Sequence, residues 1–79
     1  MYRILGIETV DYVSRKTGNR VQGTRLHLQD GTAYEDTMGN RVLSVYVKPA
    51  VNTADLALGD DVEVLYNRFG SVDDVRRVG

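Results

Sequence analysis

Two predicted turns of the chain carry positive charge, and the second also carries an aromatic residue. The first turn spans Ser14–Arg20 around the turn-forming pair Gly18-Asn19, and the second spans Asn67–Gly70 and carries Phe69. Guanidinium and ammonium groups neutralise phosphates, and aromatic rings stack on nucleobases. These turns therefore indicate a surface that contacts a phosphate backbone. Their cations are Arg15, Lys16 and Arg20 in the first turn and Arg68 in the second.

Phe69 is the most unusual of these residues. Asn67 and Gly70 are typical of a tight turn, because Gly adopts a positive φ without strain and Asn bonds nearby backbone. Apolar surface left in water forfeits roughly 25 cal/mol per Å². The sequence therefore predicts one of two arrangements: the ring folds back onto the protein, or a group from another molecule stacks on it.

Residues that could support catalysis are scarce. The chain has no Cys, one histidine (His27) and no Gly-rich phosphate loop. The pairs Asp60-Asp61 and Asp73-Asp74 are neighbours along predicted strands, so their carboxylates point to opposite faces. Asp30, Glu35 and Asp36 do not match the spacing of a calcium loop. We expect no enzymatic activity, no metal, no cofactor and no small-molecule substrate.

The elements that position these residues are predominantly strands. Alternating apolar and polar residues predict strands over 2–14, 21–29 and 42–48, with a polar loop over 30–41. The apolar phase of the first strand slips near Thr9-Val10, which predicts a bulge there. In the second strand Thr24, Leu26 and Leu28 share the core face.

Pro49 ends the third strand, and residues 54–58 are expected to form a short helix closed by Gly59. Its flanking apolar residues, Val51, Leu56 and Leu58, would plug one end of a barrel. The last segment predicts a hairpin: a strand near Val62–Tyr66, the Asn67–Gly70 turn, and a strand from Ser71 with a bulge at Asp73-Asp74.

This order of elements predicts one all-β domain over residues 1–79. Five short strands with a helix between the third and fourth describe a small five-stranded OB-fold-like barrel. An SH3-like barrel is the nearest alternative, but its short helical turn normally precedes the last strand.

Composition constrains the setting of this domain. The chain has 79 residues, no Cys and a net charge of −1. So small a core makes a homodimer an expectation. No segment reaches the ~20 apolar residues of a membrane span, and a cytoplasmic location is expected. Residues 1–29 carry five cations against two acids, whereas residues 53–67 carry four acids and no cation. Such polarity can steer a polyanion or bring two copies together.

The chain resembles the small OB-fold single-stranded-DNA-binding proteins of filamentous phages and related mobile elements. Three stretches carry the resemblance: the basic hairpin Ser14–Gly18, the Leu-x-Leu-Gly-Asp-x-Val-x-Val run at Leu56–Val64, and Arg68–Ser71 followed by Asp74–Val78. The resemblance implies a symmetric homodimer that coats single-stranded DNA during DNA replication, with little sequence specificity, in the host cytoplasm. RNA remains an alternative ligand, since stacking does not read the 2′-hydroxyl.

The resemblance also implies roles for individual residues. Arg15, Lys16 and Arg20 would neutralise phosphates, and Arg25 and Lys48 would line the groove. Phe69, accompanied by Arg68, would stack on a base or seal the groove of a neighbouring subunit. The stacking candidates are Tyr12, Tyr34 and Tyr46.

A second class of function stays open at this stage. A small β-barrel can serve as a protein-interaction module, or as a structural or adaptor part of a phage, through exposed strand edges and the Phe69 turn. The distinguishing feature is the placement of the cations. If they lie with the tyrosines on one face, nucleic acid is favoured. If they are scattered among acids, a protein partner is favoured.

Overall fold

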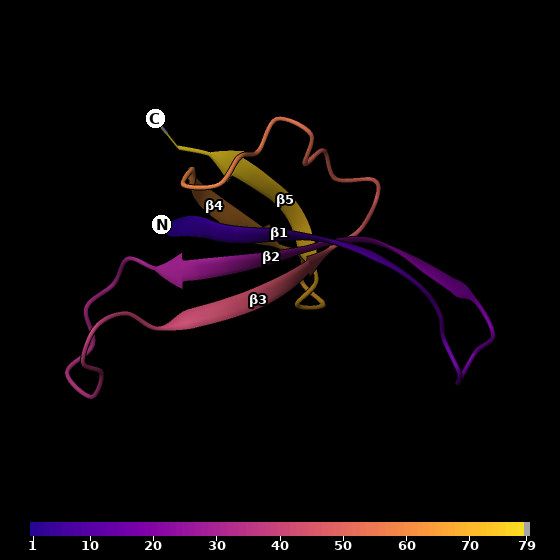
Figure 1. Ribbon diagram of the computed structural model, residues 1–79, viewed down its shortest axis with the longest axis horizontal. Coiled ribbons are helices and arrows are strands. Elements are labelled where there is room, and N and C mark those ends of the chain that lie inside the picture. The colour runs from indigo at the N-terminus through magenta and orange to yellow at the C-terminus, as the bar shows by residue number, and fades with distance from the viewer. Residues whose placement is uncertain (79) are drawn as a thin grey trace.

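The computed structural model describes residues 1–78 and consists of five β-strands joined by turns and loops (Figure 1). The strands are β1 (Tyr2–Val13), β2 (Arg20–Asp30), β3 (Val42–Val47), β4 (Asp61–Tyr66) and β5 (Val72–Arg77). They form one antiparallel sheet in the order β3-β2-β1-β4-β5. The all-β prediction with five strands is confirmed. The described residues hold no helix that is long and apolar enough to cross a membrane.

β1 and β2 form the longest hairpin of the sheet. Their ladder runs from Tyr2 opposite Asp30 to Val13 opposite Arg20. β3 pairs with β2 only from Thr24 onward, and β4 pairs with β1 only at the β1 residues Tyr2 and Arg3. The far half of the hairpin is therefore a two-stranded ribbon, which projects beyond the other strands in Figure 1. We call residues 10–23 the ribbon.

Two irregularities bend the sheet. In β1 the register shifts between Ile4 and Gly6, so the bulge lies at Leu5 and the prediction of a bulge at Thr9-Val10 is wrong. In β5 the predicted bulge at Asp73-Asp74 is confirmed, because Asp73 is an extra residue between the partners of Leu65 and Tyr66. An extra residue places side chains three apart on one face. Val72 and Val75 are consequently both buried.

The core draws on every strand of the sheet. Ile4, Leu26, Leu28, Val47 and Val62 are almost completely buried, and they belong to one apolar cluster. That cluster also includes residues of β3 and β5, the two edge strands. A sheet whose two edges contribute to one cluster must curl around it. Lys48 and Asp73 approach to 3.9 Å across the gap between these edges.

The sheet nevertheless does not close into the predicted barrel. The described residues show no ladder between β3 and β5. Each of these strands has only six residues, and in Figure 1 they diverge from the point where they approach.

The predicted helix at residues 54–58 is also absent. The chain from Lys48 to Asp60 instead makes three separate turns, closed by the N–H groups of Val51, Leu56 and Asp60. Five residues are too few to offset the cost of helix nucleation. Side chains also take backbone donors, since Asn52 Oδ1 accepts from the Ala54 N–H. Val51 and Leu56 pack on the core as predicted, but Leu58 is exposed and does not plug it.

Leu26→Ala tests this assignment of the core. The side chain of Leu26 is fully buried, so its truncation should lower the free energy of unfolding by about 2–5 kcal/mol. Urea unfolding followed by circular dichroism measures the change. Leu58→Ala removes the same atoms from an exposed site and should change stability by less than about 0.5 kcal/mol. Equal losses in the two variants would contradict the assignment.

Candidate functional site

Most cations of the protein are already paired with acids. Within residues 1–78, seven of the ten Lys and Arg side chains lie within 4.0 Å of a carboxylate oxygen. The other three occupy the tips of two hairpins. They are Arg15 and Lys16 at the β1–β2 turn and Arg68 at the β4–β5 turn. Positive charge that is not neutralised within the molecule is therefore concentrated at these two turns.

The β1–β2 turn is built as the sequence predicts. Gly18 has a φ of 72°, and the Ser14 N–H donates to the Asn19 carbonyl at 2.8 Å. Arg20 has a different role from its neighbours. It binds both carboxylate oxygens of Asp11, at 2.9 and 2.8 Å, and this bonding holds the pKa of Asp11 below its ordinary value. Arg20 thus braces the ribbon, while Arg15 and Lys16 stay unpaired at its tip.

The β4–β5 turn presents Phe69 to solvent. The Asn67 side-chain oxygen accepts hydrogen bonds from the N–H groups of Phe69, at 2.9 Å, and Ser71, at 3.1 Å. Gly70 has a φ of 81°, as the turn requires. The Phe69 ring is 77% exposed, and the Arg68 guanidinium lies 4.9 Å from its centroid. Of the two predicted arrangements, folding back onto the protein is therefore excluded.

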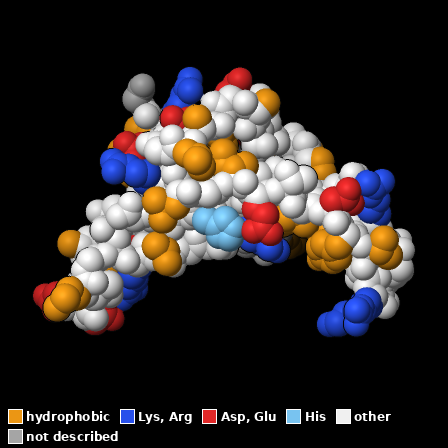
Figure 2. Space-filling view, viewed as in Figure 1, with side chains coloured by type: hydrophobic (Ala, Val, Ile, Leu, Met, Phe, Trp, Pro, Cys, Tyr) orange, Lys and Arg blue, Asp and Glu red, His pale blue; other side chains and the backbone are white. Residues whose placement is uncertain are grey.

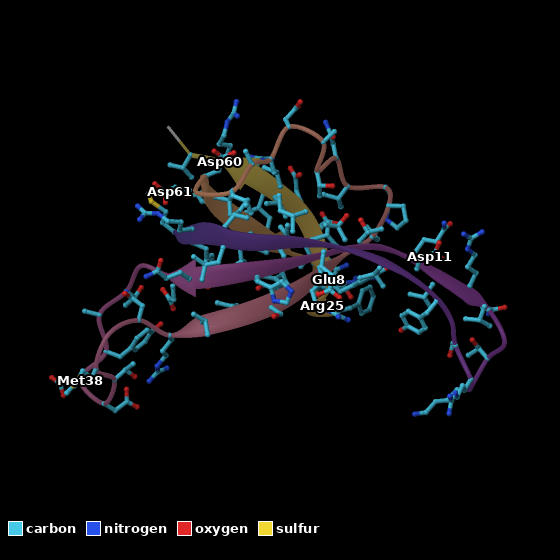
Figure 3. All side chains as sticks on the ribbon, viewed as in Figure 1. Glu8, Asp11, Arg25, Met38, Asp60 and Asp61 are labelled. Carbon is cyan, nitrogen blue, oxygen red and sulfur yellow. The ribbon has the colours of Figure 1, made fainter. Side chains whose placement is uncertain are left out.

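The outer face of β1, β2 and β3 holds a polar network around Glu8. Its carboxylate contacts His27 Nε2 at 2.9 Å and Arg25 at 3.3 Å, and His27 Nδ1 lies 2.9 Å from Ser44 Oγ. The hydrogen bond from His27, with a smaller contribution from Arg25, lowers the pKa of Glu8. Figure 3 shows Glu8 beside Arg25, and Figure 2 shows the histidine at the centre of the visible face, next to an acidic side chain. Arg25, predicted to line a groove, is neutralised here.

Tyr46 packs against the backbone of β2 on this face. Its ring lies over Gly23, and its hydroxyl donates to the Gln22 carbonyl. A Cβ atom at position 23 would stand 2.6 Å from the Val47 carbonyl oxygen and 2.7 Å from the Tyr46 ring. Position 23 therefore requires glycine. The result is a tyrosine held at the base of the ribbon with one side of its ring accessible.

A groove of about 400 Å³ opens between β3 and the β4–β5 hairpin. On one side it is lined by Tyr46 of β3 and by Lys48, which follows β3, and on the other by Tyr66, Gly70 and Ser71 of the hairpin. Lys48, a predicted groove residue, lines this groove, and Asp73 is 3.9 Å from its ammonium group. The groove thus has an aromatic ring on each wall and the Phe69 turn at its margin.

Tyr66 is a groove residue that sequence reasoning missed. Period-2 alternation placed it on the face of Val62 and Val64, toward the core. Tyr66 is the last residue of β4, where it faces Val72 in the ladder and lines the groove, and it is 50% exposed. Its position next to the turn residue Asn67 was the one available signal.

The other two tyrosine candidates lie away from the groove lining. Tyr12 is exposed on the ribbon, opposite Val21. Tyr34 lies in the β2–β3 loop, where its hydroxyl donates to Asp30 at 2.6 Å. The Arg41 guanidinium covers its ring at 3.7 Å and also binds the Asp36 carboxylate. Tyr34 is thus integrated into the structure of its own loop.

A second hollow, of about 480 Å³, lies at the opposite end of the sheet. Arg3 and Asp61 line it and pair with each other at 3.4 Å, and Gln29 bonds Asn40. No aromatic side chain contributes to its lining. The polar groups of this hollow bind one another, which makes the groove at Tyr46 the stronger candidate.

No family model, curated protein or solved structure matches the chain. Its function is therefore inferred from the geometry of the site.

Tyr34→Phe should reveal how the loop depends on pH. The Tyr34 hydroxyl, followed by the Thr32 N–H, holds the pKa of Asp30 below its ordinary value of about 3.9. A lowered pKa in the folded state stabilises the fold above pH ~4, and this stabilisation is lost as pH falls through the folded-state pKa. The variant should therefore have a lower urea midpoint than the wild type at pH 7, and the difference should shrink below pH ~4. Tyr12→Phe removes an exposed hydroxyl, and its midpoint should follow the wild type at every pH.

Proposed function

We propose that the protein binds single-stranded nucleic acid across the groove between β3 and the β4–β5 hairpin. One observation carries this proposal: the unpaired cations lie only at two turns within the described residues, and an aromatic groove lies between those turns. Backbone phosphates need positive charge that acids have not neutralised. Bases need exposed rings on which to stack.

The proposed path for the strand runs from the ribbon tip to the β4–β5 turn. The ribbon tip offers Arg15 and Lys16, and the base of the ribbon holds Tyr46 through Gly23. Tyr46 forms one wall of the groove, and Tyr66 forms the other. The path ends at the β4–β5 turn, where Phe69 is exposed beside Arg68. Phosphates are bound at the two ends of this path, and bases stack between them.

The strand order supports the same proposal at the level of fold. We infer that the sheet is an OB-fold-like barrel left open between β3 and β5, because these are the two edge strands and they contribute to one core. OB-folds are partly open barrels that bind oligonucleotides on the face of strands 2 and 3 and through the loops β1–β2 and β4–β5. The two hairpin turns correspond to these loops, and the groove has β3 as one wall and adjoins the β4–β5 turn.

The charge balance indicates how the affinity is divided between phosphate contacts and base stacking. With Arg20, Arg25 and Lys48 engaged by acids, few cations are available to release counterions from the strand. Base stacking is worth about 1–3 kcal/mol per base and depends little on base identity. Binding in this proposal therefore relies more on stacking than on charge and has little sequence specificity. DNA and RNA strands are both ligands, since stacking does not read the 2′-hydroxyl.

Salt dependence of binding to labelled oligo(dT), measured by fluorescence anisotropy, tests the proposal. The wild type should bind at low salt, weaken as salt rises, and bind duplex DNA less tightly. Arg15→Ala combined with Lys16→Ala removes two phosphate contacts. The slope of log affinity against log salt should therefore become shallower by about 1.4, at ~0.7 per contact for single strands.

Arg76→Ala combined with Arg77→Ala is the matched control. It makes the same change in net charge, but both arginines lie on β5 and pair with Asp74 and Asp60. Its salt slope should stay close to that of the wild type. Equal slopes for the two double variants would show a nonspecific charge effect. Absence of oligo(dT) binding by the wild type at low salt would overturn the proposal and favour a protein partner.

Phe69→Ala separates stacking from stability. The ring is largely exposed, so the melting temperature should hardly change, whereas the affinity for oligo(dT) should fall by about 5- to 150-fold. Met38→Ala truncates a fully exposed apolar side chain on the β2–β3 loop, and its affinity should equal that of the wild type. A large fall in melting temperature with unchanged affinity would show that Phe69 is a packing residue.

A further inference from the structure

The edge of β1 that faces away from β2 is unpaired over most of its length. β4 occupies this edge only near Tyr2 and Arg3, and two further bonds join Ile4 to Gly59 and Asp60. Among the described residues, Gly6–Val13 makes no backbone hydrogen bond to any segment except β2. We call Gly6–Ser14 the free edge. A long, unpaired strand edge is a template for pairing with another chain.

Apolar side chains accompany this edge. Ile7 is 41% exposed and Val13 is 63% exposed, and Tyr12 is also exposed. The ribbon that carries Tyr12 and Val13 has only two strands, and an isolated two-stranded hairpin is marginally stable in water. Natural proteins usually protect such an edge with Lys, Pro or a covering element. Residues 6–13 contain neither Lys nor Pro.

We propose that two copies of this chain pair through their free edges, antiparallel and about a two-fold axis at Val10. The ladder would join the two sheets into one. Ser14 of one copy would lie opposite Gly6 of the other. Gly6 is past the last contact with β4, and Ser14 begins the β1–β2 turn. The free edge is thus used from end to end, and each ribbon gains a third strand.

Symmetry restricts the register. A two-fold axis perpendicular to a sheet keeps each side chain on its own face, and facing residues of a ladder share a face. The axis must therefore pass through a residue position and not between two. With the axis at Val10, this residue faces its own copy, and Ile7 faces Val13 of the partner. Exposed apolar side chains then meet at the two Ile7–Val13 pairs, and Val10, which is already buried within its own copy, lies at the axis.

The acidic side chains of β1 also favour the register with the axis at Val10. With the axis at Val10, Glu8 faces Tyr12 of the partner, and Asp11 faces Thr9 of the partner. Each carboxylate then lies opposite a hydroxyl group that can donate to it, and like charges do not face each other. Cross-strand pairs of this kind stabilise a sheet, whereas directly opposed like charges destabilise it.

The neighbouring registers are each less favourable. An axis at Thr9 places Glu8 against Val10 and Asp11 against Ile7, so that carboxylates oppose apolar groups. An axis at Glu8 or at Asp11 opposes a carboxylate to its own copy. Each of these registers also leaves part of the free edge unpaired.

The proposed pairing leaves the groove accessible and does not depend on nucleic-acid binding. β2 separates β1 from β3, which forms one wall of the groove. The Phe69 turn lies on the β4–β5 hairpin, which has no residue on the free edge. The experiment is therefore carried out without nucleic acid, and its failure would not bear on the function proposed above.

Disulfide trapping tests both the dimer and its register. The chain has no cysteine, so single cysteines report single contacts. Residues facing each other in an antiparallel ladder have Cα atoms about 4.5–5.5 Å apart, within the range that a disulfide can bridge. We expect Ile7→Cys mixed with Val13→Cys to form a covalent dimer under mild oxidation. Neither variant alone should do so, because each cysteine would lie far from its own copy.

Met38→Cys mixed with Val13→Cys is the control for random collision, since Met38 is fully exposed on the β2–β3 loop (Figure 3) and should give no such dimer. Sedimentation of the wild type should show a dimer, and Val13→Asp should shift it toward monomer. A wild type that stays monomeric at high micromolar concentration would overturn the proposal. A dimer whose Ile7 and Val13 cysteines do not cross-link, or whose Val13→Cys cross-links to itself, would overturn the register and this interface.

Discussion

Burial of one small apolar cluster is the constraint on which the rest of the structure depends. The cluster takes residues from all five strands, including both edge strands, so the sheet must curl around it. None of its members belongs to the ribbon, which extends beyond the other strands in Figure 1. A chain of 79 residues has little further apolar surface to bury. The two hairpin turns and most of the β1 edge are consequently left in solvent, where they are available to other molecules.

Pairing between acids and cations determines which charges remain available. Asp11, Glu8 and Asp73 engage Arg20, Arg25 and Lys48 on the sheet. Surface ion pairs of this kind contribute little to stability. Their main consequence is to place the unpaired positive charge at the hairpin tips, so a protein with a net charge of −1 still has cations for the phosphate contacts proposed above.

The groove and the free edge use different parts of the sheet. The groove lies where β3 and β5 fail to close, and the free edge lies where β4 stops following β1. Both arise because the strands differ in length: β1 and β2 have 12 and 11 residues, and the other three have six each. Long strands beside short ones leave unpaired backbone, and the two proposals assign an occupant to each resulting surface.

Local sequence was sufficient for the strands, both hairpin turns and the Asp73 bulge, because alternation and turn residues act over a few neighbours. It was not sufficient for the missing helix, the open sheet or the Leu5 bulge, which depend on competition between distant contacts. The candidate site divides in the same way. Arg15, Lys16, Arg68 and Phe69 were evident as turn residues. Tertiary pairing of separate strands decided the rest of the site. It brought acids to Arg20 and Arg25, packed Tyr46 against Gly23 and left Tyr66 exposed.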